Sequence, residues 1–204
     1  MYLARISLVF ACVVLMQGCA SIPATKSVDQ RQAQALYQQH LQNNASIESF
    51  SLQARIGVQT EGKGFSGSLH WQHDANHDEI TLFSPLGGQV ASMQKNADGI
   101  TLTDANGHIQ TAADAETLTQ NLLGWRLPLQ GLADWALGRP HSIPIQAISL
   151  DDRGLITSLQ QDDWLISYDH YSEQNGHLLP SKMVLHSKKL TLKILIDDWY
   201  IPSH

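Results

Sequence analysis

Apolar and polar residues alternate through residues 50–59, FSLQARIGVQ, in five successive repeats of period two. Because the side chains of a β-strand point alternately to its two faces, this pattern predicts a strand with one buried and one exposed face. The alternation returns in residues 65–71 after a glycine-containing turn at residues 62–64, so the two segments predict a β-hairpin. Strands of this kind need a covering layer, which restricts the chain to folds built around a sheet.

The order of the remaining elements narrows the fold class. Helices are predicted at residues 28–44, after the capping residue Asp114, and from Pro128 to a stop at Gly138. Further strands are predicted at residues 80–83, 90–94, 99–103, 155–160, 164–168, 182–187 and 190–196. Strands and helices do not alternate as in a parallel sheet. We therefore predict a mainly β fold with helices, in which one open, strongly curved antiparallel sheet carries helices on its concave face and leaves an apolar space between the layers.

The first 18 residues have the pattern of an export signal. Arg5 gives a positive start, residues 6–16 are almost wholly apolar, and Gly18 precedes Cys19. The apolar run is too short to span a bilayer as a permanent helix. Its end resembles the lipobox of bacterial lipoproteins, which implies cleavage after Gly18 and acylation of Cys19; an ordinary secretory signal is the alternative. We expect a signal peptide at residues 1–18, a lipidated tether at 19–27 and one domain at 28–204.

Charge and cysteine content limit the partners. The net charge is −6 and no basic stripe is visible, which argues against nucleic acid. Attraction to anionic headgroups is also expected to be minor, so membrane attachment would rest on acyl chains and apolar contacts. After cleavage Cys19 is the only cysteine, so no disulfide supports the fold. In enterobacterial lipoproteins an Asp after the cysteine favours the inner membrane, and its absence here favours the outer membrane, facing the periplasm.

No residue pattern points to catalysis. His70 and His73 lie an odd number of residues apart on a predicted strand and so point to opposite faces. The Asp pairs at 151–152, 162–163 and 197–198 lack EF-hand spacing and are expected to be solvated. The sequence contains no P-loop, dinucleotide fingerprint or zinc motif. We therefore expect neither an enzyme nor a cofactor or metal site.

The segment Ser84-Pro85-Leu86-Gly87 predicts a β-turn between two strands, with Leu86 at its tip. A leucine exposed at a tip would gain roughly 1.5–3 kcal/mol on entering lipid or an apolar groove. The alternative is that Leu86 folds back onto the core. The residues alone leave both possibilities open.

Several motifs, taken in order, resemble the LolB family of outer-membrane lipoprotein receptors. They are Ala54-Arg55-Ile56-Gly57, Trp71-Gln72, Pro85-Leu86-Gly87, Ala113-Asp114-Ala115-Glu116, Pro128-Leu129, Leu132, Trp135, Leu137-Gly138-Arg139-Pro140 and Asp198-Trp199. The resemblance implies an open β half-barrel lined by helices. It also implies that the protein accepts triacylated lipoproteins from the periplasmic carrier LolA and inserts them into the outer membrane. The loop Pro85, Leu86 and Gly87 would then assist insertion into lipid.

A carrier of this kind must shield acyl chains, because each exposed CH₂ costs about 0.8 kcal/mol. The candidate cavity residues are apolar positions on predicted strands and helices: Ile56, Leu69, Trp71, Leu82, Leu118, Leu122, Leu132, Ile166, Leu192 and Ile194. Ordinary core packing is the alternative for each of them. With no nucleotide motif, transfer would run downhill in free energy, and the receptor is expected to act as a monomer.

Two other functions fit part of the pattern. A lipid-binding or envelope-stress-sensing lipoprotein of the same half-barrel fold would bind acyl chains without delivering them, and would not need an apolar loop tip. An anchored periplasmic hydrolase would need an activity that depends on residues such as His70 or His73. The apolar tip at Leu86 favours the receptor.

Overall fold

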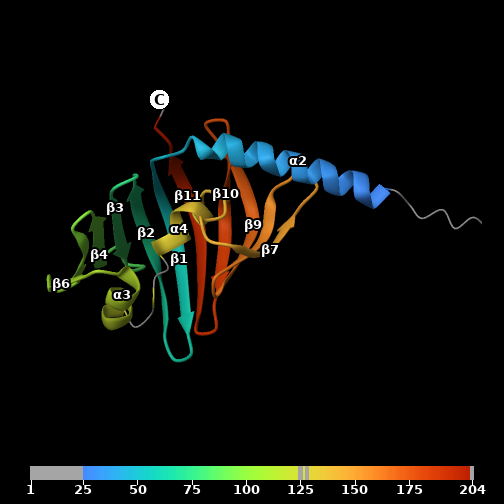
Figure 1. Cartoon of the computed structure of the whole chain (residues 1–204). Coiled ribbons are helices and arrows are strands. Elements are labelled where there is room, and N and C mark those ends of the chain that lie inside the picture. Colours follow the sequence, from blue (N-terminus) through green and yellow to red (C-terminus); the bar gives the residue numbers. More distant parts are fainter. Residues whose placement is uncertain (1–24, 124–125, 127–128, 203–204) are drawn as a thin grey trace, which may run out of the picture.

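An antiparallel sheet dominates the computed structural model, which describes residues 25–123, 126 and 129–202. Within these residues the sheet has 11 strands, in the order β6-β5-β4-β3-β2-β1-β11-β10-β9-β8-β7. The strands are β1 (Phe50–Thr60), β2 (Gly64–His73), β3 (Asp78–Phe83), β4 (Gln89–Asn96), β5 (Gly99–Asp104), β6 (Ile109–Ala112), β7 (Ile145–Leu150), β8 (Ile156–Gln161), β9 (Trp164–Gln174), β10 (His177–His186) and β11 (Leu190–Tyr200). The two edge strands do not meet, so the sheet is open (Figure 1).

The first and last strands pair at the centre of the sheet. Strand β1 runs antiparallel to β11, with Ile56 opposite Ile194, and also pairs with β2. The alternate residues of β1 that the periodicity places on the inner face are all buried, from Phe50 to Val58. The predicted hairpin and the predicted antiparallel arrangement are confirmed.

Three helices complete the described fold: α2 (Thr25–Ala45), α3 (Ala115–Leu123) and α4 (Leu129–Ala136). Helices α3 and α4 lie on the concave side of the sheet, whereas α2 crosses one end of it, near β7 and β10 (Figure 1). The carboxylate of Asp114 accepts a hydrogen bond from the Thr117 N–H at 2.8 Å and caps α3 as predicted. None of the described helices combines the length and apolar character that crossing a bilayer requires.

The core fills the space between the sheet and the two inner helices. Trp135 and Leu132 of α4 are almost fully buried and belong to the same core cluster as Leu159, Ile166 and Met183 of the sheet. The predicted signal peptide, Cys19 and most of the predicted tether lie outside the described residues.

Candidate functional site

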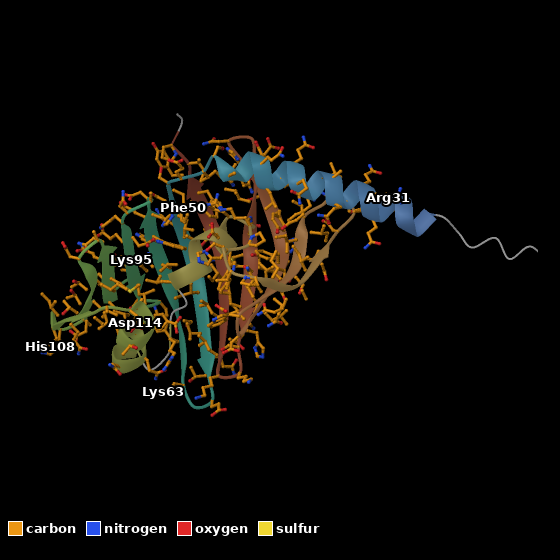
Figure 2. All side chains as sticks on the ribbon, viewed as in Figure 1. Arg31, Phe50, Lys63, Lys95, His108 and Asp114 are labelled. Atoms are coloured by element: carbon orange, nitrogen blue, oxygen red, sulfur yellow. The ribbon has the colours of Figure 1, made fainter. Side chains whose placement is uncertain are left out.

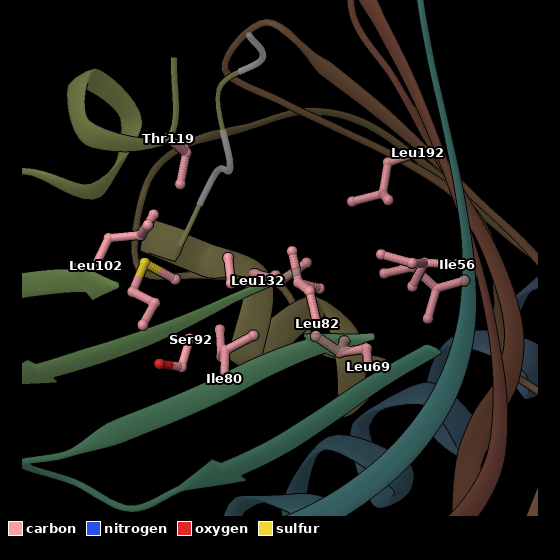
Figure 3. A pocket seen from close by; sticks show the side chains of 12 residues that line it. Ile56, Leu69, Ile80, Leu82, Ser92, Leu102, Thr119, Leu132 and Leu192 are labelled. Carbon is pink, nitrogen blue, oxygen red and sulfur yellow. The ribbon is translucent and has the colours of Figure 1, made fainter. Parts of the chain in front are cut away.

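A cavity lies between the concave face of the sheet and the two inner helices, on the side of β1 that leads to β5. Its walls come from β1 to β5, from β11, and from one residue of each inner helix. Figure 3 shows Leu102, Leu132 and Leu192 pointing into this space from different elements. The lining consists of Ile56, Leu69, Ile80, Leu82, Ala91, Ser92, Met93, Leu102, Thr119, Leu132, Leu192 and Ile194.

The cavity lining is almost wholly apolar. Its two polar residues are Ser92 and Thr119, and the Thr119 hydroxyl donates to the Ala115 carbonyl within α3 at 2.8 Å. No charged residue is among those that line it. Such a surface suits a hydrocarbon chain and offers little to a charged or strongly polar ligand.

Six of the residues predicted to line a cavity do so: Ile56, Leu69, Leu82, Leu132, Leu192 and Ile194. Trp71, Leu118 and Ile166 are buried but do not line it. Ile166 lies on β9 in the other half of the sheet, while the Trp71 indole points to a carboxylate. The side chain of Leu122 lies outside what the structure describes. Whether any of these residues contacts an acyl chain stays a prediction.

Periodicity gives a signal for lining residues that the prediction omitted. Ala91 and Met93 alternate on β4 and are both buried on the inner face, and Leu102 does the same on β5. Both strands are predicted from the sequence, so alternation also indicates that these three side chains face the inner side of the sheet. Thr119 gave no such signal, because a polar residue on a helix is ordinarily placed toward solvent.

The cavity is small in this conformation. Its free volume is about 30 Å³, which is room for roughly two or three water molecules. A long acyl chain does not fit unless the inner helices or the lining side chains move. In this conformation the lining side chains themselves fill most of the space between the sheet and the inner helices.

Helix α4 is fastened to the sheet by buried hydrogen bonds. The Trp135 indole donates to the side-chain carbonyl of Gln161 at 2.9 Å, and the Tyr168 hydroxyl donates to the Trp135 carbonyl at 3.0 Å. Burial raises the pKa of Tyr168 well above its ordinary value, so the phenol stays a donor. These two bonds join the C-terminal end of α4 to β8 and β9.

At the end of α4 and just beyond it, four polar side chains form a chain of contacts. The two carboxylate oxygens of Asp134 bind Arg139 Nε and His141 Nδ1, each at 2.7 Å, and Ser142 Oγ lies 3.3 Å from His141 Nε2. The atom order matches a serine–histidine–aspartate triad. However, Asp134 is shared with Arg139, whose guanidinium also donates to the Asn44 carbonyl at 2.7 Å. None of these residues lines the cavity, so the arrangement supports a structural clamp between α4 and the end of α2.

The predicted β-turn protrudes from the rim of the sheet between β3 and β4. The Gly87 N–H donates to the Ser84 carbonyl at 2.9 Å, and Gly87 adopts a positive φ of 83° that glycine tolerates best. Leu86 at the tip is 98% exposed, so it does not fold back onto the core. Leu82 and Ala91 line the cavity on the two strands that the turn connects. The strands that hold the exposed leucine, β3 and β4, therefore also form part of the cavity wall.

A buried carboxylate lies at the opposite end of β3. Asp78 Oδ1 accepts hydrogen bonds from Trp71 Nε1 at 3.0 Å and from His73 Nδ1 at 2.7 Å, while Oδ2 lies 3.3 Å from Lys95 Nζ. Burial alone would raise the pKa of Asp78, but the bonds from His73 and Trp71 hold it below its ordinary value. His70 lies on the other face of β2, against Phe83. The two histidines thus contribute to different surfaces.

A family model described as "Outer membrane lipoprotein LolB" matches residues 48–199. A protein named outer-membrane lipoprotein LolB from Pseudomonas savastanoi pv. phaseolicola is 31% identical over 192 residues, which cover 94% of each chain. A protein of the same name from Pseudomonas putida is 29% identical over 195 residues, covering 96% of this chain and 95% of its own.

Solved structures share the fold at much lower identity. A LolA superfamily protein from Nitrosomonas europaea aligns with a TM-score of 0.52 at 8% identity, covering 84% of this chain and 94% of its own. A DUF1329 family protein from Desulfovibrio piger gives a TM-score of 0.55 at 8% identity, covering 84% and 92%. At this identity the likeness extends to the open sheet with inner helices and no further.

Proposed function

Because this chain belongs to the LolB family of outer-membrane lipoproteins, we propose that it accepts triacylated lipoproteins from a LolA-type periplasmic carrier and inserts them into the outer membrane. It would hold the acyl chains in the apolar cavity and act as a monomer anchored through Cys19. The observation that carries this proposal is the 98% exposed Leu86 on a turn whose two strands also line the cavity.

The cavity supports the acceptance step. Exposing an acyl chain to water costs about 0.8 kcal/mol of free energy for each CH₂, so a carrier must bury most of the chain throughout the transfer. The lining offers aliphatic side chains from several strands and no charge. Because the free volume is only about 30 Å³, the cavity must open to accept a chain. The free energy of opening would lower the apparent affinity and favour later release.

The loop supports the delivery step. Leu86 has no apolar contact to lose on leaving water, so insertion into hydrocarbon would gain about 1.5–3 kcal/mol. The turn holds the leucine outward through hydrogen bonds of Ser84 with Gly87 and Gly88. Insertion of the tip would bring β3 and β4, and hence that wall of the cavity, to the membrane surface. Release can then run downhill into the bilayer without nucleotide hydrolysis.

The test is a transfer assay with the mature chain carrying Cys19→Ala. This substitution removes the acylation site and leaves residues 25–202 unchanged. A LolA-type carrier loaded with a fluorescent lipoprotein is mixed with this protein, first alone and then with vesicles. We expect the wild-type domain to take up the label and pass it to the vesicles. Leu86→Glu should take up the label equally but release it about 10- to 100-fold more slowly, since the apolar gain is lost.

A matched control separates the leucine from the added charge. Leu86→Gln removes the apolar side chain from the turn and adds no charge. This variant should release label about as slowly as Leu86→Glu, because both lose the apolar gain. If wild-type protein takes no label from the carrier, the receptor function is wrong and a lipid-binding sensor becomes the better hypothesis. If Leu86→Gln releases label at the wild-type rate, the slow release by Leu86→Glu is an effect of charge and Leu86 has no special role.

A further inference from the structure

The topology gathers alternate turns at the end of the sheet that carries Leu86. Neighbouring strands are antiparallel, and Thr60 at the end of β1 lies opposite Leu190 at the start of β11. The turns that share this end comprise residues 61–63, 84–88, 105–108, 162–163 and 187–189. In Figure 2, Lys63 and His108 mark this end, while Phe50 lies toward the other end. We call it the Leu86 end.

The free lysines of the described chain lie at or near the Leu86 end. Lys95 pairs with Asp78 and Lys182 pairs with Asp169 at 2.7 Å. The other lysines with described side chains are exposed and form no ion pair with a described residue: Lys63, Lys188, Lys189 and Lys193. Lys188 and Lys189 occupy the β10–β11 turn, Lys63 the β1–β2 turn, and Lys193 the nearby outer face of β11. These are the turns that precede the Leu86 turn around the rim.

The opposite end has a different charge. Its turns carry the acidic residues Asp74, Asp98, Asp151 and Asp152, against the single cation Arg153. The turns of the Leu86 end carry three lysines and three acidic side chains, two of which belong to the more distant β8–β9 turn. Asp104, at the end of β5 beside this surface, adds a carboxylate that contacts His108. The charged side chains are therefore unevenly distributed over the protein, whose net charge is −6, and the lysines are concentrated near Leu86.

A second exposed apolar residue lies at the Leu86 end. Ile109 is 68% exposed at the start of β6, directly after the 105–108 turn. The β3–β4 and β5–β6 turns are neighbours, because β4 pairs with β5. Leu86 and Ile109 therefore lie on adjacent turns, and the β1–β2 turn with Lys63 is the next turn on the other side of Leu86.

We propose that the Leu86 end is a docking surface for an anionic lipid bilayer, in which the free lysines bind headgroup phosphates while Leu86 and Ile109 enter the acyl region. This inference rests on the proposed function, because it takes Leu86 as a residue that enters lipid. It replaces the expectation, based on net charge, that headgroup attraction is minor. Two weak signals acting together, charge and apolar insertion, give reversible membrane binding where each alone is marginal.

Binding of the Cys19→Ala protein to sedimented vesicles tests the lysines. The vesicles contain phosphatidylethanolamine with or without phosphatidylglycerol as the anionic lipid. Lys188→Gln with Lys189→Gln should weaken binding to anionic vesicles about 10- to 30-fold and leave the weak binding to neutral vesicles unchanged. The matched control, Arg31→Gln with Arg153→Gln, removes two exposed positive charges away from this end and should have a much smaller effect. Added salt should weaken wild-type binding and narrow the difference.

A second pair tests the apolar contribution. Ile109→Ser should weaken binding to both kinds of vesicle, whereas Tyr200→Ser, at a 66% exposed residue of the opposite end, should not. Equal losses for the lysine and arginine variants would overturn the proposal, because net charge alone would explain them. It would also be overturned if the lysine variant lost cargo uptake from the carrier and kept vesicle binding, since the lysines would then serve the carrier.

The two proposals fail separately. Vesicle binding needs no carrier, and cargo uptake needs no vesicle. If binding depends on the lysines but wild-type protein takes no cargo, only the receptor function falls. If cargo is delivered while binding ignores the lysines and Ile109, only the docking surface falls.

Discussion

Gly154 lies where the β7–β8 turn meets helix α2, and its missing side chain allows that contact. A Cβ at this position would stand 2.5 Å from the Tyr37 amide nitrogen and 2.7 Å from the Ala33 carbonyl oxygen, and the residue has a φ of 76°. Gly154→Ala should therefore lower the free energy of unfolding by about 2–4 kcal/mol, from backbone strain and the displaced helix. Urea denaturation followed by circular dichroism measures this change.

Gly176 provides the matched comparison for Gly154. It has a φ of 83°, but nothing lies within 4 Å of the position its Cβ would take. Gly176→Ala should cost only the backbone strain, about 1–2 kcal/mol. Equal losses in the two variants would show that the contact with α2 contributes nothing.

The buried carboxylate of Asp78 should make the stability of the fold sensitive to acid. Its pKa is lowered in the folded protein, so its stabilising contribution is complete above the unfolded pKa of about 4 and is lost as pH falls through the folded value. Asp78→Asn should lower stability at pH 7 by about 1.5–3 kcal/mol and flatten the loss of stability below about pH 4. Urea midpoints measured from pH 7 to pH 2 test both effects. The exposed Asp163→Asn should change neither, and a parallel acid profile in Asp78→Asn would contradict the assignment.

For single residues, the sequence predicts where a side chain lies better than it predicts which groups the side chain contacts. The turn chemistry around Pro85 and Gly87 predicts that Leu86 stands at a tip, and it does. Alternation assigns Trp71 to the inner face of β2, and its side chain is buried on that face but does not line the cavity. Its indole nevertheless binds Asp78, seven residues away, and no local pattern encodes that contact. The face of the sheet to which a side chain points is set by local strand geometry, whereas its hydrogen-bond partner depends on how the strands pair.

The elements that periodicity missed are the two edge strands, β6 and β7. Residues 109–112 and 145–150 are mostly exposed. Of their alternate residues, only Ile148 and Leu150 of β7 are partly buried against the core. Period-two alternation reports burial of one face and not strand pairing itself. An edge strand with little buried surface therefore leaves a weak signal, while β1 and β11 at the centre leave the strongest.

Helix α4 is predicted to depend on a single glutamine of β8. Gln161 accepts bonds from the Trp135 indole and the His141 N–H, and donates to the His141 and Ile143 carbonyls. Gln161→Leu would leave these groups without their partner and should lower the free energy of unfolding by about 2–4 kcal/mol. The neighbouring Gln160→Leu, half-buried on the other face of β8, should be nearly neutral. Similar losses in urea denaturation would contradict this role.

Considered as a whole, the molecule holds its cavity closed while retaining an apolar lining. The two halves of the sheet meet at β1 and β11, and the inner helices cover the concave face of both. Sequence predicts the lining through alternation, but cavity volume depends on how side chains from six strands interdigitate, which no linear pattern records. A receptor that must open before it binds has an affinity set partly by the opening equilibrium. That equilibrium is open to change by mutation.

Met93 and Met183 allow a test of this idea, because both are buried methionines on inner faces but only Met93 lines the cavity. Each change to Ala should destabilise the fold by about 2–5 kcal/mol. Met93→Ala also adds free volume where an acyl chain would lie, so less of the structure must move for the chain to enter. This variant should bind a palmitoyl probe more tightly and pass lipoprotein to vesicles more slowly, whereas Met183→Ala should change neither. Equal probe affinities in titrations of the two variants would show that opening does not limit binding, and that the closed cavity does not set the direction of transfer.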